Sequence, residues 1–350
     1  MRILVTGGNG FLGARIVQRL VDAGHEVTVF ARSVASHSDS AIATSDRTGL
    51  FEKGFKRQSR NPRMAKGDLR NAVEVSAAIA GHDAVFHVAA KAGVWGSRSE
   101  YFDINLRGTQ NVLAACHTHG VTSLIYTSTP SVVFGAMALE GANEDTPYAR
   151  RFLTHYAESK CMAEKEVLGA NGVGALRTVA LRPHLIWGKG DPHLVPRVLA
   201  RARAGKLKRV GDGTNKVDIT HVEDAADAHL LALEKIEVAA GKAYFISSEA
   251  VLLWDWINAL ISRFGLKPIT RQVSRVTAYR AGAVLEFFYG LFGASKEPPM
   301  TRFVAENLAT SHWFDISRAR KDLGYEPRRF GVEALDDYVK TEAQHAAHQD

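Results

Sequence analysis

Apolar runs and amphipathic segments alternate along the first part of the chain. Runs rich in branched and aromatic side chains predict buried strands at 2–6, 25–32, 82–90 and 121–129. Segments with an apolar position every three to four residues predict helices between them, at 11–23, 72–80 and 101–119. This alternation predicts an α/β fold of Rossmann type, a doubly wound parallel sheet with right-handed crossovers.

Two segments depart from this rhythm. Residues 33–66 are rich in Ser, Thr, Arg and Lys and have little apolar periodicity, so we expect a polar, solvent-exposed insertion. The alternative is that this segment shields one end of a ligand. From about residue 183, Gly and Pro recur along the chain, and segments with helical periodicity of apolar residues follow. We therefore expect a Rossmann domain over 1–182 and a smaller, mainly helical substrate-binding part over 183–350, with returns to the main sheet.

Composition and charge narrow the functional classes. The chain has 350 residues, of which 46% are hydrophobic and 23% charged, as in an ordinary globular protein. Its net charge of +7 is spread out and accompanies no nucleic-acid-binding module, so we do not expect nucleic acid as a partner. Cys116 and Cys161 form neither a metal-ligand spacing nor a disulfide framework, and no metal site is expected. With no signal peptide and no apolar run of the roughly 20 residues that span a bilayer, we expect a cytoplasmic protein.

The first strand runs directly into the glycine-rich sequence TGGNGFLG, which opens a helix at Phe11 and Leu12. Gly7 and Gly10 permit a tight turn and the close approach of a ligand, and Gly13 permits helix–strand packing. The N-terminus of the helix offers free N–H groups to a pyrophosphate. Position and spacing together predict a dinucleotide-binding site.

The residues that end the second strand read TVFARS and contain no carboxylate for a ribose 2′-hydroxyl. Arg32 can instead pair with a 2′-phosphate, so NADP(H) is favoured, with NAD(H) as the alternative. We expect Asp68 and Leu69 to lie near the adenine, with the Asp68 carboxylate available to its amino group. The small side chains of Ala89 and Ala90 suit a backbone that lies near the cofactor.

A pair of polar side chains in YAESK suggests catalysis. Tyr156 and Lys160 are four residues apart on a predicted helix, so both project from one face. We expect the ammonium to lower the pKa of the phenol, which would exchange a proton with an alcohol or carbonyl oxygen. Thr129, or else Ser128, would hold that oxygen at the end of the strand before it. Asn105 would anchor a proton-relay water near Lys160 or simply pack between helices.

Together these motifs resemble the extended short-chain dehydrogenase/reductase family. The similarity runs through TGGNGFLG, GDL, FHVAA, NLRGTQNV, YTSTPSVVF, YAESK and LRPHLIWG. Within the family, GDGTNKVDITHVEDAADAH and GKAYFIS resemble the 3β-hydroxysteroid dehydrogenase branch. KAGVWG and TSTPSV are most similar to the bacterial 2-alkyl-3-oxoalkanoate reductases of olefin biosynthesis.

The resemblance implies an enzyme that transfers hydride at C3 of a lipid-like substrate, reducing a 2-alkyl-3-oxoalkanoate to the 3-hydroxy acid. It assigns the acid/base role to Tyr156 and a hydrogen bond with the cofactor ribose to Lys160. It also adds Pro183 to the cofactor-binding residues. Thr129 stands where many relatives have Ser, and Asn105 falls on the family's helix Asn. A homodimer through the helices that carry Asn105 and Tyr156 is also implied.

Other functions stay open at this point. A 3β-hydroxysteroid or sterol-4-carboxylate 3-dehydrogenase would use the same residues in the opposite direction. A nucleotide-sugar epimerase or dehydratase shares the fold, but the apolar character of 251–293 argues against it. A non-catalytic NADP-sensing protein would not need the hydroxyl, Tyr and Lys together. Residues 277–293 are apolar with few charges, so this segment could form a contact with a membrane surface or a biosynthetic complex.

Overall fold

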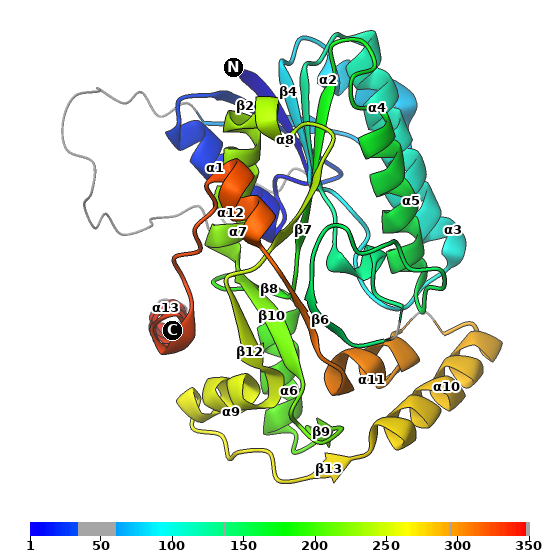
Figure 1. The fold of residues 1–350 in the computed structure, drawn as a ribbon, viewed down its shortest axis with the longest axis vertical. Helices are drawn as coiled ribbons and strands as arrows, with labels where there is room; N and C mark the ends of the chain where they lie inside the picture. Colours follow the sequence, from blue (N-terminus) through cyan, green and yellow to red (C-terminus); the bar gives the residue numbers. More distant parts are fainter. Residues whose placement is uncertain (34–60, 136, 295, 348–350) are drawn as a thin grey trace.

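Figure 1 shows a computed structural model of the protein, which describes residues 1–33, 61–135, 137–294 and 296–347. The upper part in this view is a parallel sheet with helices on both faces. The lower part is a smaller sheet surrounded by helices. The fold is therefore the predicted Rossmann-type sheet with a further, largely helical C-terminal portion.

The large sheet has seven strands, all parallel to their neighbours. In spatial order they are β11 (Ala243–Ile246), β7 (Arg177–Pro183), β5 (Ser123–Thr127), β4 (Ala84–His87), β1 (Arg2–Thr6), β2 (Glu26–Ala31) and β3 (Arg63–Lys66). The chain adds β2 and β3 on one side of β1, and then β4, β5 and β7 on the other. Ligands of such sheets bind outside the carboxyl ends of the strands at this reversal, here between β1 and β4.

The expected insertion at 33–66 extends too far. Its last residues, 63–66, form the edge strand β3, in register with 28–31 of β2. Its sequence, RMAK, is only partly buried, and charged side chains are well suited to a sheet edge, which is why the segment looked like a loop. Residues 34–60 lie outside the described part of the chain.

Helices cover both faces of the large sheet (Figure 1). One face is covered by α1 (Phe11–Asp22), α7 (Val222–Glu234), α8 (Ile236–Ala239) and α12 (Ser317–Leu323). The other is covered by α2 (Ala72–Ile79), α4 (Gly108–Thr118) and α5 (His155–Gly169). Alternate apolar residues of the strands fill the core on each side, as a sheet buried on both faces requires.

The helix predicted at 101–119 is divided in the structure. It begins with α3 (Arg98–Tyr101), continues as a π-helical turn η1 (Phe102–Arg107) and ends as α4. Such turns contain an extra residue per turn and occur frequently at functional sites. A short 3₁₀ turn, η2 (Pro130–Val132), follows β5.

The smaller sheet is built from strands that lie far apart in the sequence. Its order is β12 (Glu249–Leu252), β10 (Lys216–His221), β14 (His312–Phe314) and β6 (Leu139–Ala142), and β8 (Ile186–Trp187) also pairs with β10. A separate pair consists of β9 (Arg209–Val210) and β13 (Gln272–Val273). The surrounding helices are α6 (Leu194–Arg203), α9 (Leu253–Arg263), α10 (Arg275–Leu291), α11 (Arg302–Ala309) and α13 (Gly331–Ala347). Within the described residues, no helix is long and apolar enough to cross a membrane.

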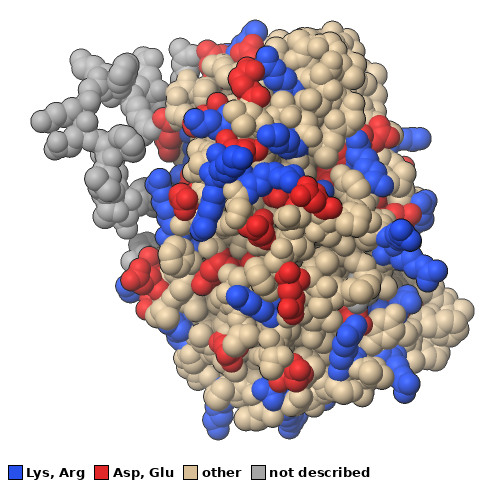
Figure 2. Space-filling model, in the orientation of Figure 1, with Lys and Arg blue, Asp and Glu red and all other residues tan. Residues whose placement is uncertain are grey.

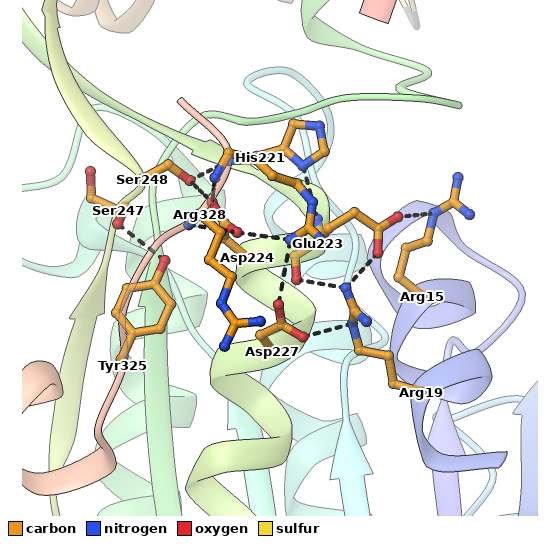
Figure 3. Close-up of polar contacts among 11 residues, drawn as sticks. Arg15, Arg19, His221, Glu223, Asp224, Asp227, Ser247, Ser248, Tyr325 and Arg328 are labelled. Carbon is orange, nitrogen blue, oxygen red and sulfur yellow. Dashed lines mark hydrogen bonds and ion pairs between the residues drawn. The ribbon is translucent and has the colours of Figure 1, made fainter. Parts of the chain in front are cut away.

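Ion pairs hold α1 against α7 (Figure 3). Arg19 contacts Glu223 at 2.7 Å and Asp227 at 2.9 Å, and Arg15 contacts Glu223 at 3.2 Å. These side chains are only partly exposed, so they are less screened than surface pairs. Because the glycine-rich loop leads into α1, the same contacts help to fix the position of that loop.

Asp224 joins α7 to the segment that follows α12 (Figure 3). Its carboxylate is 1% exposed and accepts hydrogen bonds from the Ser248 hydroxyl at 2.7 Å and from Arg329 Nη1 at 3.0 Å. The backbone N–H groups of Arg328 and Arg329 also donate to it. The buried charge is thus satisfied on several sides, as its burial requires.

Candidate active site

The glycine-rich loop packs tightly between β1, α1 and the end of β4. Gly7 has a φ of 68°, and a Cβ there would lie 2.9 Å from the Ala89 Cα. A Cβ on Gly13 would overlap the Gly7 carbonyl. The Gly7 N–H donates to the Phe30 carbonyl, and the Gly10 N–H donates to the Gly7 carbonyl, both at 2.9 Å. Backbone hydrogen bonds therefore hold the tight turn, and a side chain at Gly7 or Gly13 would not fit.

The N-terminus of α1 lies at the carboxyl ends of β1 and β4, where the order of strands in the sheet reverses. The helix starts at Phe11, which is partly buried, and Leu12 packs into the core beneath it. The first N–H groups of a helix have no partner within the helix, and they bind anions well. The close packing of the loop and this helix end fit a dinucleotide whose pyrophosphate lies over the first turn of α1.

Positive charge gathers at the end of β2, where the adenosine end of such a cofactor would lie. Arg32 is exposed directly after the strand. Asp68 has both carboxylate oxygens bonded to Arg70, at 3.0 Å and 2.6 Å, so an adenine amino group would share this carboxylate with Arg70. The bond to Arg70 lowers the pKa of Asp68, and Arg32 adds a smaller effect. The neighbouring Leu69 is buried in the core.

A directed chain of hydrogen bonds runs from β1 to the π-helical turn. Thr109 donates to the carbonyl of Asn105 at 2.6 Å, so it accepts from Nε2 of His87 at 2.9 Å. Nδ1 of His87 therefore accepts from Thr6 at 2.8 Å, and Thr6 accepts from the Ala89 N–H at 3.2 Å. Burial lowers the pKa of His87 to about 3, which keeps the ring neutral, as these bonds require. Sequence reasoning missed this network; the only signal was a histidine within an otherwise apolar strand.

Asn105 lies on η1 and is 2% exposed. Its side-chain oxygen accepts from the Lys91 N–H at 2.7 Å, and its amide donates to the Lys91 carbonyl and the Ser159 hydroxyl, both at 3.0 Å. Ser159 in turn donates to the carbonyl of Tyr156. Asn105 thus ties the loop after β4 to the first turn of α5, in addition to packing between the helices.

Lys160 points from α5 toward the end of β5. Its Nζ donates to the Thr127 carbonyl at 2.7 Å and lies 4.1 Å from the centre of the Tyr126 ring. Burial lowers the pKa of Lys160 to about 7, against a smaller opposing effect of Glu164. The ammonium is therefore close to losing its proton at neutral pH unless a further negative or polar group reaches it.

Tyr156 lies in the first turn of α5, and its pKa differs from the expectation. Burial raises this pKa, and a hydrogen bond with the Thr129 side chain lowers it in part. The predicted lowering by Lys160 is not found, because the ammonium bonds to the Thr127 carbonyl instead. The structure nevertheless brings together the hydroxyls of Tyr156 and Thr129. Ser128 is buried, and its hydroxyl has no hydrogen-bond partner among the described residues.

A buried ion pair lies beneath Lys160, and it too was missed. Glu164 is fully buried and contacts Arg182 through Nε at 3.1 Å, and Tyr148 donates to the same carboxylate at 2.8 Å. Tyr156, Lys160 and Glu164 are spaced by four residues, so a polar stripe along the helix was the available signal. Arg182 immediately precedes Pro183, which ends β7 and is buried as well.

Aromatic contacts connect Tyr156 to α10. The Tyr101 ring lies edge-on to Tyr156 at 6.4 Å, and its hydroxyl donates to the Trp95 carbonyl at 3.1 Å. The Trp95 ring meets Tyr289 of α10 edge-on at 6.3 Å, and its Nε1 donates to the Ala294 carbonyl at 2.8 Å. Helix α10 is thus linked to Tyr156 by successive contacts.

Comparisons with known proteins agree with this geometry. The model of the 3-beta hydroxysteroid dehydrogenase/isomerase family matches residues 4–274. A 2-alkyl-3-oxoalkanoate reductase of Shewanella oneidensis is 48% identical, over 92% of this chain and 81% of the relative. The reductase of the same name from Stenotrophomonas maltophilia is 46% identical, over 94% and 95% of the two chains.

Among solved structures, a dTDP-glucose 4,6-dehydratase of Streptomyces venezuelae with bound NAD is similar in fold. Its TM-score is 0.72 at 21% identity, and the match covers 97% of this chain and 96% of that one. At this identity the likeness shows the fold alone. The family match and the identities to the two reductases show more: this chain belongs to the 3-beta hydroxysteroid dehydrogenase/isomerase family and is an NAD(P)-dependent oxidoreductase.

Proposed function

We propose that the protein reduces a 2-alkyl-3-oxoalkanoate to the corresponding 3-hydroxy acid, with NADPH as the hydride donor. The observation that carries the proposal is the pairing of the Tyr156 and Thr129 hydroxyls at the carboxyl end of β5, at the edge of the sheet where the glycine-rich loop also lies. The reductases of Shewanella oneidensis and Stenotrophomonas maltophilia, at 48% and 46% identity, support the choice of substrate.

The roles of the residues follow from their chemistry. The cofactor supplies the hydride that C3 receives. Tyr156 donates a proton to the oxygen on C3, and the raised pKa of its phenol keeps that proton in place near neutral pH. Thr129 donates its single hydroxyl proton to the oxygen on C3 and so holds that oxygen beside Tyr156. Tyr156 then regains a proton from solvent.

Other residues hold the cofactor and the helix. Gly7, Gly10 and Gly13 shape the loop for the pyrophosphate, and Ala89, Ala90 and Pro183 provide small or rigid neighbours for the nicotinamide end. Lys160 bonds to the nicotinamide ribose. Asn105 is a positioning residue, because it acts on Tyr156 through Ser159. The substrate-binding part lies among the residues after 183 that do not join the large sheet.

NADP(H) is the proposed cofactor. Arg32 is exposed at the end of β2 and lies near enough to Asp68 to affect its pKa, so a cation faces the adenosine end. Arg70, whose side chain is 51% exposed, adds a second cation there. A 2′-phosphate would gain charge-assisted hydrogen bonds that a 2′-hydroxyl would not.

A homodimer through α4 and α5 accompanies this proposal. These helices lie side by side on one face of the sheet, with Gln110 bonded to Glu166 between them. Met162, on α5, is 40% exposed, and such a side chain is well suited to an interface. Sedimentation velocity at several concentrations tests this point separately from activity.

A second candidate is oxidation of a 3β-hydroxysteroid. The family model that matches residues 4–274 takes its name from that activity, and the same side chains would serve it. With a steroid the hydride would leave C3, and Tyr156 would accept the proton of the alcohol.

The test offers the protein a long-chain 2-alkyl-3-oxo acid and a 3-oxosteroid separately, each with NADPH and with NADH, and follows absorbance of the reduced nicotinamide. Oxidation of NADPH with the keto acid supports the proposal. Turnover of the steroid alone moves the assignment to the second candidate. Turnover with NADH alone contradicts the role given to Arg32.

A further inference from the structure

Helix α10 turns a row of large apolar side chains to solvent. Val276, Val284, Phe287, Phe288 and Leu291 share one side of the helix, and Phe292 follows at its end. Their exposed fractions are 57%, 55%, 65%, 47%, 65% and 78%. We call these six residues the outer face of α10. Large exposed apolar areas on soluble proteins mark sites of interaction.

The opposite side of the helix is fixed, so the outer face cannot turn inward. A Cβ on Gly282 would lie 2.6 Å from the Thr301 backbone, which shows how closely α10 and α11 approach. Ala278 is buried at the same contact. Glu286 accepts a hydrogen bond from the Arg302 N–H and pairs with its Nε, both at 2.6 Å. These contacts therefore orient the helix so that the outer face points to solvent.

The acidic side chains nearest this face in the sequence, Glu286 and Glu297, are engaged in ion pairs with Arg302 and Arg197. Glu286 is the only acidic residue of α10, and it points inward to Arg302. Arg280 is exposed on the helix four residues before Val284, and Lys296 is exposed beyond its end. In Figure 2 the projecting end of α10, at the right edge, is tan, with blue side chains beside it. Apolar side chains flanked by cations are typical of helices that lie on anionic bilayers.

A second copy of the chain fits this face poorly. In a twofold dimer the same surface meets itself, so both copies would bring their Arg280 side chains into one largely apolar interface. The outer face has no carboxylate to neutralise them, because Glu286 is engaged with Arg302. Anionic lipid headgroups, in contrast, would pair with Arg280 while the Phe and Leu side chains enter the acyl boundary.

We propose that the outer face of α10 binds the surface of an anionic lipid bilayer and so places the active site where a lipid-like substrate is concentrated. The second part rests on the proposed function. It follows from the contacts of the inner side of the helix: Tyr289 meets Trp95, whose carbonyl accepts from Tyr101, and Tyr101 contacts Tyr156. A substrate that leaves the bilayer at α10 is therefore a few side chains from the proton donor.

Vesicle co-sedimentation tests the proposal with the full chain. We expect wild-type protein to bind vesicles of phosphatidylcholine and phosphatidylglycerol, and to bind vesicles of phosphatidylcholine alone more weakly. Phe287→Ser with Leu291→Ser lowers the partition coefficient at least about tenfold, because two large apolar side chains no longer leave water. Arg280→Glu weakens binding to the anionic vesicles only, and added salt reduces the difference from wild type.

Phe330→Ser is the matched control, because Phe330 is 52% exposed but lies outside α10. It binds vesicles like wild type, and circular dichroism with thermal melting shows that all variants remain folded. Absence of wild-type binding, or equal loss in the Phe330 control, contradicts the proposal. A third outcome also contradicts the proposal: wild type self-associates without lipid, and the Phe287/Leu291 variant does not. The outer face would then join two copies of the chain.

A separate measurement keeps the two proposals apart. NADPH oxidation with a short-chain, water-soluble 2-alkyl-3-oxo acid needs no vesicles, and the Phe287/Leu291 variant retains it. If wild type lacks this activity, the proposed function fails whatever the vesicles show. If the activity is present and vesicle binding absent, only the docking of α10 fails.

Discussion

Lys160 donates a hydrogen bond from Nζ to the backbone carbonyl of Thr127 at 2.7 Å. The contact fixes the ammonium between α5 and the end of β5, in surroundings that lower its pKa to about 7. A buried ammonium destabilises the folded state as long as it keeps its proton.

The stability of the protein should therefore respond to pH through Lys160. Between its folded pKa of about 7 and its ordinary value of 10.5, the unfolded chain binds more protons than the folded one, so this residue makes stability rise with pH. From pH 7 to pH 9, we expect wild type to gain about 2 kcal/mol relative to Lys160→Met. Denaturant unfolding of both proteins at both pH values measures this difference, and other titrating groups cancel. A difference that is flat or falls with pH would show that Lys160 titrates normally.

Replacement of the Tyr156 phenol tests the proton donor. Tyr156→Phe should lower kcat at least about a hundredfold, because general acid catalysis contributes that much or more. The dissociation constant for NADPH should change by less than about twofold, since the phenol acts in the chemical step. Fluorescence titration measures binding and absorbance measures turnover. Unchanged turnover would remove Tyr156 from the mechanism.

Thr129 allows a companion comparison. Thr129→Ser retains the hydroxyl that the structure places beside Tyr156, and Thr129→Val removes it at nearly the same volume. We expect the Ser variant to keep most of the wild-type kcat and the Val variant to lose about tenfold or more. A Val variant that is as active as the Ser variant would show that the hydroxyl is not needed.

We expect the choice between NADPH and NADH to depend on Arg32, which directly follows β2. Arg32→Ala should raise the KM for NADPH about tenfold and leave the KM for NADH nearly unchanged, because a charge-assisted bond to the 2′-phosphate is lost. Arg63→Ala is the control. Arg63 is exposed on β3, and its strand partner on β2 is Thr28, so it lies toward the amino ends of these strands, away from Arg32. Equal effects on the two cofactors would assign Arg32 no part in selecting between them.

The carboxylate of Asp224 should contribute to stability rather than to chemistry. Asp224→Asn keeps the shape but weakens the bonds to Arg329 and Ser248, and we expect a loss of about 2 kcal/mol in the free energy of unfolding. Asp227→Asn should lose less than about 1 kcal/mol, because the Asp227 side chain is 33% exposed. Urea unfolding at constant m-value compares the two. The reverse ranking would mean that the bonds to Asp224 add little.

Local patterns predicted four strands of the large sheet and the glycine-rich loop before α1. The glycine spacing, the strand before it and the helix after it are encoded by adjacent residues, so Gly7, Gly10 and Gly13 could be placed from the sequence. The spacing of Tyr156 and Lys160 likewise indicated one helix face. The family recognised from these motifs is confirmed by the family model and the relatives.

Features that depend on distant contacts could not be predicted. The strands of the smaller sheet are short, and β6 pairs with β14 across about half the length of the chain. The π-helical turn around Asn105 has the periodicity of an ordinary helix within its own few residues. The pKa of Tyr156 depends on burial and on Thr129, neither of which a spacing of four residues reveals. The hydrophobic pattern did not indicate strand β3, because its polar side chains are suited to the edge of a sheet.

The position of β11 has a consequence for how the protein is made. This strand, Ala243–Ile246, covers the edge of β7 with a full register of pairs, and Phe245 packs against the Arg182 guanidinium. Until residue 246 has left the ribosome, β7 is an open sheet edge with a charged side chain that should be buried. The nascent chain thus cannot complete its seven-stranded sheet before residue 246 has been synthesised. Most of the polypeptide must be synthesised before the first half becomes a protected, folded unit.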